Sequence, residues 1–372
     1  MRVLLSVVGT RGDVQPVLAL ALEVRKLGHE VRLCVPPNFV EWANQLGFAA
    51  TAVGIEMRAP RAGAPAPQAP PDLISDQFET IGAAAKGCDI IVGANAHQYA
   101  APSIAELNRI PYVNALYAPT ALPNDVNSRA WNQRSLERVN QNRARLGILP
   151  IDDVLRYIVT KEPWLATDPT LDPSASNSGD AVVQTGAWIL VDTTPLPSEL
   201  DAFLRAGEPP VYIGFGSMPV PEGTNRTLIE AARGAGRRTI VAQGWAELRP
   251  SDDGADCIAV GDINQQALFP HVAAVVHHGG AGTTLAAARA GAPQVIVPMF
   301  SDQPFWARRV HELGIGASLP FAELSAAGLT SALHTALEPS VAQRARELAS
   351  GIVLDGAALA ARRLIGVLTP SS

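Results

Sequence analysis

Short apolar segments alternate with helix-like segments along most of this 372-residue chain, and this alternation restricts the fold more than any other feature. Residues 3–8 (VLLSVV) form a continuous apolar run that ends at a glycine, and residues 14–28 then carry apolar side chains at helical spacing. The pattern returns at 29–36 and 38–47. Strands that alternate with helices predict an α/β protein whose parallel sheet is covered by helices on both faces.

The alternation occurs in two separate halves of the chain. Residues 192–210 are rich in proline and acidic side chains, which marks a boundary between the halves. Further strands are predicted at 89–94 and 111–117 before this boundary, and at 211–217, 238–244, 257–262, 273–278 and 293–299 after it. We therefore expect two doubly wound, Rossmann-like domains at 1–191 and 211–355, joined by the linker 192–210, with a final helix at 356–372 that packs back toward the first domain.

Two segments between these elements have an unusual composition. Residues 59–71 (APRAGAPAPQAPP) have no periodicity and predict a flexible or polyproline-like surface loop. Residues 121–150 are strongly polar and predict either a solvent-facing helix or a segment on the side of a ligand cleft.

Composition excludes several classes of function. The net charge is −6, which argues against a nucleic acid partner, because phosphate neutralisation requires a basic surface. No apolar run is long enough to predict a membrane span, and the first apolar run is too short for a signal peptide. The cysteines at 34, 88 and 257 have no paired spacing, and no metal-binding spacing occurs, so we expect reduced thiols, no metal and a cytoplasmic location.

A polar, glycine-rich turn, HHGGAGTT (277–284), stands between the predicted strand at 273–278 and a helix. Its glycines let a ligand approach the backbone, and the start of the helix offers free N–H groups and a partial positive charge. These features predict an anion site suited to a phosphate, with His278 and Thr283 as donors beside it. The competing interpretation is an ordinary tight turn capped by threonine. His277 is expected to belong to the core.

Other phosphate-binding motifs do not fit this sequence. The glycine-rich turn lacks the lysine of a Walker sequence, and Leu285 stands where a dinucleotide fingerprint has its third glycine. The segment GFGSM (214–218) fails the same test at Pro219. These mismatches disfavour ATP-cleaving and NAD-dependent enzymes.

Further polar residues follow the ends of predicted strands. Asp302 and Gln303 predict a pair that holds adjacent sugar hydroxyls, unless Asp302 only caps the next helix. Asp13 is either a general base or a helix cap, and Ser217 is either a phosphate donor or a cap. Because open α/β sheets bind ligands beyond the carboxyl ends of their strands, we expect the site in the crevice between the two halves.

Several longer segments resemble a known family. They are GTRGDVQP (9–16), PPVYIGFGS (209–217), the run from GDINQQALFPHV to FWARRVHELGIG (261–316), PWLATDPTL (163–171) and VVQTGAWILVD (182–192). They resemble the GT-B glycosyltransferases that decorate natural products, and most of all the glycopeptide-antibiotic enzymes of the vancomycin and teicoplanin type. The resemblance covers nearly the whole chain and implies two Rossmann-like domains that face a central cleft.

The resemblance also implies a role for each motif. The N-terminal domain would bind the acceptor, with Asp13 as the base, and the C-terminal domain would bind a nucleotide-sugar donor. The donor residues so implied are His278, Gly279, Gly280, Ala281, Gly282, Thr283 and Ser217 for the diphosphate, Asp262, Ile263 and Gln265 near the nucleobase, and Asp302, Gln303, Thr10, Arg11 and Gly12 around the sugar.

The chain departs from the wider family at several positions. Thr10 and Arg11 stand in the first turn, where many relatives outside the glycopeptide group have a histidine. Asp262 stands where plant relatives carry an aromatic residue that stacks on the nucleobase, and Ala286 stands where they carry a ribose-binding glutamate. Residues 55–78 and 121–150, both on the acceptor side, are shorter than in the glycopeptide enzymes.

The resemblance therefore predicts an inverting glycosyltransferase. It would move a hexose from a dTDP- or UDP-sugar to a hydroxyl of a natural-product aglycone, such as a glycopeptide precursor, without a metal or other cofactor and as a monomer or weak dimer. The alternatives are a nucleotide-sugar epimerase of the same architecture, a transferase for a macrolide, sterol or other lipophilic acceptor, or a binding protein without catalysis.

Overall fold

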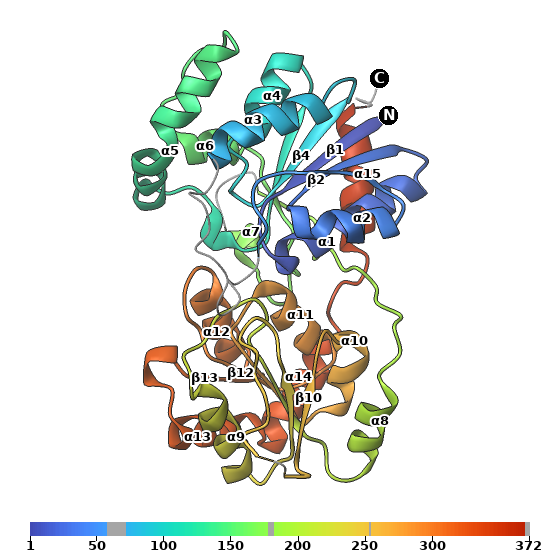
Figure 1. The fold of residues 1–372 in the computed structure, drawn as a ribbon, viewed down its shortest axis with the longest axis vertical. Helices are drawn as coiled ribbons and strands as arrows, with labels where there is room; N and C mark the ends of the chain where they lie inside the picture. Colours follow the sequence, from blue (N-terminus) through green and yellow to red (C-terminus); the bar gives the residue numbers. More distant parts are fainter. Residues whose placement is uncertain (58–71, 178–181, 253, 369–372) are drawn as a thin grey trace. The chain divides into compact units, whose positions relative to one another are not determined.

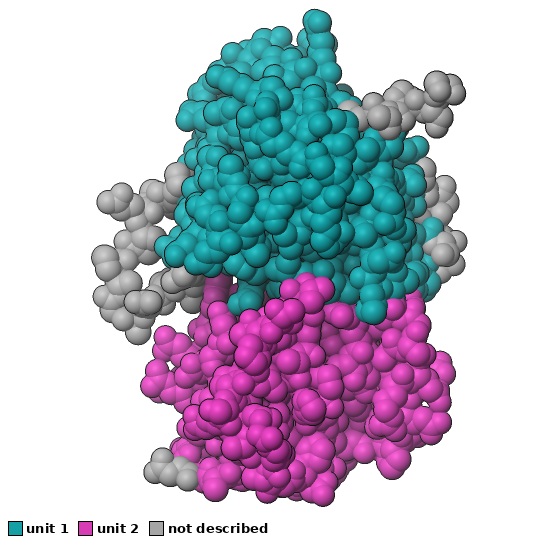
Figure 2. Space-filling model, turned by 90° about the vertical axis from the view of Figure 1, so that its right-hand side faces the viewer, with its two compact units in different colours: residues 1–169, 173–190, 353–372 teal, residues 170–172, 191–352 magenta. Residues whose placement is uncertain are grey.

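A computed structural model describes residues 1–57, 72–177, 182–252 and 254–368 (Figure 1). The predicted loop at 59–71 lies outside these residues. The chain divides into two compact units, coloured separately in Figure 2. Unit 1 comprises residues 1–169, 173–190 and 353–372, and unit 2 comprises residues 170–172 and 191–352.

Unit 1 is built on a seven-stranded parallel sheet with the strand order β3-β2-β1-β4-β5-β6-β7. The strands are β1 (Arg2–Val7), β2 (Glu30–Val35), β3 (Ala49–Ala52), β4 (Ile90–Ala94), β5 (Tyr112–Leu116), β6 (Trp164–Leu165) and β7 (Val183–Gln184). Val3, Leu5 and Val7 of β1 point into one core and Leu4 points into another. This alternation follows from the two-residue repeat of a strand, and it requires helices on both faces of the sheet.

Two groups of helices cover these faces (Figure 1). One core contains α1 (Arg11–Lys26), α2 (Val40–Gln45) and α15 (Gly356–Leu368), and the other contains α3 (Leu73–Ala84), α4 (Ala101–Asn108), α5 (Asp125–Arg145) and α6 (Val154–Ile158). The remaining short helices of unit 1 are η1 (Pro37–Phe39), η2 (Pro119–Ala121) and α7 (Ser174–Asn177). The final helix α15 packs against α1 in the same core.

Unit 2 repeats the arrangement with a six-stranded parallel sheet in the order β10-β9-β8-β11-β12-β13. Its strands are β8 (Val211–Gly214), β9 (Thr239–Ala242), β10 (Cys257–Val260), β11 (Ala274–His277), β12 (Gln294–Ile296) and β13 (Gly316–Ser318). Its helices are α8 (Ser198–Arg205), α9 (Thr224–Gly234), α10 (Gln265–Leu268), η3 (Phe269–His271), α11 (Ala281–Arg289), α12 (Gln303–Glu312), η4 (Phe321–Glu323), α13 (Ala326–Ala336) and α14 (Pro339–Ala349). Two doubly wound units are thus confirmed.

Some elements differ from the prediction for identifiable reasons. Strand β3 exposes most of its four residues at the sheet edge, so it lacks the apolar run that marks a strand. The polar segment at 121–150 contains helix α5, but this helix is not wholly solvent-facing, because Arg143 is 2% exposed. The Arg143 guanidinium donates to Ser103, Tyr157, Glu106 and the carbonyl of Leu149.

Candidate functional site

The first candidate residues lie in unit 1, in the turn between β1 and α1. The backbone N–H of Thr10 donates to Oδ2 of Asp13 at 2.9 Å, so Asp13 does act as part of the helix cap. The same oxygen lies 3.4 Å from Oγ1 of Thr10. The hydroxyl of Tyr117, which follows β5, donates to the backbone carbonyl of Asp13 at 3.0 Å. Both the backbone and the carboxylate of Asp13 are therefore held by neighbouring groups.

Gly9 gives the Asp13 carboxylate its space. Its φ of +149° is a backbone conformation that side chains rarely adopt, and a Cβ at this position would lie 2.2 Å from Oδ2 of Asp13. Any side chain at position 9 would expel the carboxylate from its place against Thr10. Gly9 is therefore needed both for the backbone conformation of the turn and for the room that the Asp13 side chain occupies.

Arg11 and Gly12 occupy the exposed first turn of α1. The Arg11 guanidinium lies 5.2 Å from the ring centroid of Trp42, close enough for a cation–π contact. A Cβ at Gly12 would meet only Oγ1 of Thr10, at 3.8 Å, so no steric constraint requires glycine there.

Asn95 was not identified from the sequence, and the structure places it against Asp13. It directly follows β4, which pairs with β1, and its Nδ2 donates to Oδ1 of Asp13 at 3.1 Å and to the carbonyl of Val8 at 2.5 Å. The only local signal was an asparagine at the end of a predicted strand, in VGANAHQ.

The second group of candidate residues lies in unit 2, where β11 leads into α11. The N-cap residue of α11 is Gly280, and no side chain of the described residues caps the helix. The hydroxyl of Thr284 instead donates backward to the carbonyl of Gly280. A threonine-capped turn, the competing interpretation of this sequence, is therefore wrong. The first N–H groups of α11, including those of Ala281, Gly282 and Thr283, have no side-chain cap to accept from them.

The His278 ring borders this helix start between two glycines. A Cβ on Gly280 would lie 2.6 Å from its Nε2, and a Cβ on Gly216 would lie 3.3 Å from its Cε1. Among the described residues, Nδ1 of His278 is buried and has no hydrogen-bond partner. Burial lowers the pKa of His278 to about 4, so the ring is neutral at pH 7. An orphaned buried nitrogen beside an uncapped helix start is typical of a ligand site.

His277 is fully buried, as the sequence predicted, and its ring is hydrogen-bonded to the backbone of the turn. Its Nδ1 accepts from the backbone N–H of Gly279 at 3.1 Å, which leaves Nε2 as the donor to Oε1 of Gln294 at 2.9 Å. Burial, with a smaller effect of His278, lowers the pKa of His277 to about 3. Because the Gly279 N–H points inward, it is not available to a phosphate, which corrects the expectation for this residue.

Asp302 and Gln303 begin α12, but their side chains have different surroundings. Oδ2 of Asp302 accepts from Nε1 of Trp306 at 2.9 Å, and burial raises the pKa of Asp302 above its usual value. Gln303 is 3% exposed, and its Oε1 accepts from the N–H groups of Met299 and Phe300. The side-chain carbonyl of Gln303 therefore holds the backbone of the turn at Met299 and Phe300. Its Nε2, which lies 3.5 Å from Sδ of Met218, is the atom of this side chain that could donate to a sugar.

The other predicted donor residues lie on loops that follow β8 and β10. Ser217 is half-buried after β8, Asp262 is exposed after β10, and Ile263 packs against the core beside α8 and α10. Nε2 of Gln265 lies 3.3 Å from the Tyr212 hydroxyl.

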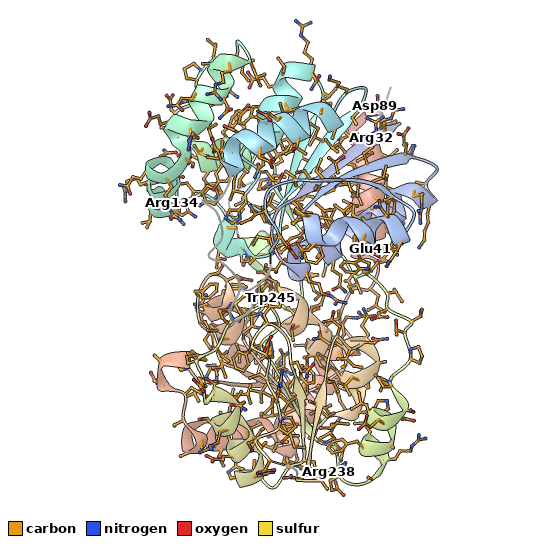
Figure 3. The ribbon with its side chains drawn as sticks, viewed as in Figure 1. Arg32, Glu41, Asp89, Arg134, Arg238 and Trp245 are labelled. Atoms are coloured by element: carbon orange, nitrogen blue, oxygen red, sulfur yellow. The ribbon has the colours of Figure 1, made fainter. Side chains whose placement is uncertain are left out.

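Trp245 lies on the loop after β9. Its backbone N–H donates to the carbonyl of Gly216 at 2.8 Å, which ties this loop to the one that carries Ser217. Figure 3 shows Trp245 and Arg238 at opposite ends of unit 2. Because Arg238 directly precedes β9, Trp245 lies at the carboxyl end of the sheet. These loops therefore share the sheet edge with the β11–α11 turn.

The described residues contain neither a metal-binding cluster nor a membrane-spanning helix. In the parts of the chain that the structure describes, no three His, Cys, Asp or Glu side chains are grouped so that they could hold a metal ion. In the same residues, no helix combines the length and apolar character needed to cross a membrane.

The chain matches two known protein families and close relatives. Residues 3–123 match the glycosyltransferase family 28 N-terminal domain, and residues 254–363 match the erythromycin biosynthesis protein CIII-like C-terminal domain. The vancomycin aglycone glucosyltransferase of Amycolatopsis orientalis is 42% identical over 99% of this chain and 98% of its own length. The dTDP-epi-vancosaminyltransferase of the same organism is 41% identical over 93% of this chain and 92% of its own length.

A solved structure shows the same fold. The glycosyltransferase of kitacinnamycin superposes with a TM-score of 0.77 at 20% identity, covering 99% of this chain and 98% of its own. The chain is therefore a glycosyltransferase with the GT-B fold, and it belongs to the family of the vancomycin-type antibiotic glycosyltransferases.

Proposed function

We propose that this glycosyltransferase moves a hexose from a dTDP- or UDP-sugar to a hydroxyl group of a glycopeptide aglycone, with inversion at C1 of the sugar. The observation that carries the proposal is the uncapped start of α11 beside the orphaned Nδ1 of His278. The names of the two Amycolatopsis relatives support it, since one includes an aglycone and the other a dTDP-sugar.

The donor diphosphate would bind at the β11–α11 turn. The N–H groups of Gly282 and Thr283 and the neutral His278 ring are donors that need no reorganisation when charge develops on the leaving group. Ser217 and the backbone loop at Gly216 would complete the site, and Asp302 with Nε2 of Gln303 would meet the sugar. In this proposal, protein donors rather than a metal ion neutralise the diphosphate.

Asp13 would act as the general base. The acceptor oxygen attacks C1 while the bond from C1 to the phosphate oxygen breaks, the acceptor proton moves to the Asp13 carboxylate, and the nucleoside diphosphate leaves. A positioned base contributes about 10²- to 10⁴-fold to the rate, and a direct displacement inverts the configuration at C1. Thr10 and Gly12 would border the sugar at the same turn.

Two variants test this division of roles. Asp13→Ala should abolish turnover while the affinity for UDP or dTDP, measured by calorimetry, stays the same. His278→Ala should weaken nucleoside diphosphate binding by about 10-fold or more, because it removes a donor to a charged group. Unchanged turnover in the first variant excludes Asp13 as the base, and unchanged affinity in the second excludes the phosphate role of His278.

A screen identifies the substrates. Purified protein is incubated with dTDP- and UDP-hexoses and a panel of glycopeptide, macrolide and sterol acceptors, and products are detected by mass spectrometry. A hexose adduct on the glycopeptide aglycone supports the proposal. An adduct on a sterol or macrolide only, or a 2-epimerised sugar without an acceptor, contradicts it.

A further inference from the structure

Asn95 in unit 1 makes a hydrogen bond to Asp13 that the helix-capping role of Asp13 does not require. The cap needs one carboxylate oxygen, and Oδ2 of Asp13 already accepts from the Thr10 N–H. The other oxygen, Oδ1, accepts from Nδ2 of Asn95, a residue 82 positions further along the chain. With this second bond, both oxygens of the carboxylate accept a hydrogen bond from a fixed donor, which sets the plane of the group.

The Asn95 side chain can be oriented in only one way. Its Oδ1 accepts from the backbone N–H of His97 at 2.8 Å, so the amide nitrogen must face the other side. The two hydrogens of that nitrogen are directed to the Val8 carbonyl and to Oδ1 of Asp13. The donor to Asp13 is therefore set before any substrate arrives.

The Asn95 backbone is held as firmly as its side chain. Its φ is +64°, a left-handed conformation that asparagine tolerates better than most residues. Its N–H donates to the carbonyl of Ala115 at 2.7 Å, and its own carbonyl accepts from Nδ2 of Asn114 at 3.0 Å. Asn114 is fully buried on β5 and also donates to the Gly93 carbonyl. Residues of β4 and β5 thus hold a strained residue in place beside the carboxylate that follows β1.

We infer that Asn95 is the positioning residue of the catalytic base, which aims the Asp13 carboxylate by a hydrogen bond to Oδ1. This inference rests on the proposed role of Asp13. Asn95 takes no proton in the reaction; it holds one carboxylate oxygen so that the carboxylate of Asp13 faces the acceptor hydroxyl. A misplacement of a reacting group by about 1 Å costs about 100-fold in rate, so removal of the bond should lower kcat by about 10- to 100-fold.

Two substitutions at position 95 distinguish the effect of the side-chain amide from the effect of the backbone conformation. Asn95→Gly keeps a residue that adopts a φ of +64° easily and removes only the amide, and kcat should fall while the KM values for donor and acceptor stay within about twofold. Asn95→Asp keeps the shape but places a second carboxylate against Asp13, and kcat should fall further. Arg109→Gly is the matched control, because Arg109 is exposed at the end of α4 with a φ of +57° and should tolerate glycine without loss of kcat.

A double-mutant comparison tests whether Asn95 acts through Asp13. In the Asp13→Ala background, Asn95→Gly should cause no further loss of the residual turnover, because the group that it orients is already absent. A further loss equal to that of the single variant, or an unchanged kcat in Asn95→Gly, overturns the inference. If Asp13→Ala itself keeps full turnover, the proposed base is wrong, and that failure is recognised separately.

A measurement on the free protein needs no substrate. In an NMR spectrum, one side-chain N–H proton of Asn95 should be shifted downfield and protected from exchange by its bond to a carboxylate, and Asp13→Ala should remove both effects. An Asn95 signal that is the same in wild type and Asp13→Ala shows that the bond is not formed in solution and overturns the inference.

Discussion

A single methyl group at Gly280 should reduce donor affinity, and the structure gives the reason. The backbone of Gly280 has φ −65° and ψ 141°, which alanine adopts without strain, so only the methyl group itself matters. It would lie 2.6 Å from Nε2 and 3.2 Å from Cε1 of His278. Normal van der Waals separation is about 3.5 Å, so the ring must move by about 1 Å.

The size of the effect follows from the geometry of a hydrogen bond. A donor at about 2.9 Å from an oxygen that retreats by about 1 Å no longer makes a hydrogen bond. A hydrogen bond to a charged group contributes about 1.5–3 kcal/mol, which is about 10- to 100-fold in Kd. Gly280→Ala should therefore weaken UDP or dTDP binding by about as much as His278→Ala.

Gly282→Ala is the informative comparison. A Cβ at Gly282 would meet no atom of the described residues within 4 Å, so the free protein should fold normally, and alanine should favour the α11 helix slightly. If a diphosphate lies against this part of the backbone, the methyl group occupies its space and nucleotide affinity falls. Gly366→Ala, on α15 in unit 1 and also without neighbours within 4 Å, is the control.

Isothermal titration calorimetry at one fixed salt concentration measures these affinities, and circular dichroism confirms that each variant folds. The double variant His278→Ala, Gly280→Ala should bind no more weakly than His278→Ala alone, since both changes remove the same donor. A Gly280→Ala protein that binds UDP and dTDP as tightly as wild type would refute the reasoning.

Three further predictions concern protonation and packing. Burial lowers the pKa values of His277 and His278 to about 3 and 4, below the roughly 6.5 of an unfolded histidine, so the unfolded chain binds protons first as the pH falls. Between pH 6.5 and its folded pKa, each ring should therefore lower the free energy of unfolding by up to about 1.4 kcal/mol per pH unit. Histidine NMR signals should show both rings neutral at pH 5. His277→Ala should weaken nucleotide binding indirectly, by releasing the inward N–H of Gly279, and a solved structure of the variant should show the turn displaced. Arg143→Met should lower the free energy of unfolding of unit 1 by about 1–3 kcal/mol in urea denaturation, because the buried hydroxyl of Ser103 and the hydroxyl of Tyr157 lose a hydrogen-bond partner, while nucleotide binding by unit 2 stays unchanged.

Local patterns in the sequence were sufficient to predict the strands of both sheets that carry apolar runs and the turn that holds His278. A glycine between a strand and a helix indicates both where the strand ends and where the next element begins. Short or exposed strands such as β3 and β6 carry no such signal, because their pairing partners rather than their own side chains place them.

The directions of polar groups could not be predicted in the same way. Gly279 and Gln303 lie in motifs that suggested ligand contact, yet the Gly279 N–H and the Gln303 carbonyl point into the protein. Each direction depends on a partner, His277 or the Met299 N–H, whose own orientation is fixed only in the folded sheet. Asn95 escaped notice for a related reason, since 82 residues separate it from Asp13 and only the pairing of β1 with β4 brings them together.

The two interpretations of Asp13, a helix cap and a base, are compatible in this geometry. A cap alone is satisfied through Oδ2 and Thr10, and any rotation about the carboxylate that keeps this bond would serve it equally well. A base must also present a lone pair in one direction, and that requires a second fixed point. Asn95 supplies this point at the cost of a left-handed backbone, which a cap does not need. The cap holds the carboxylate at the start of α1, and the amide from the end of β4 decides where it faces.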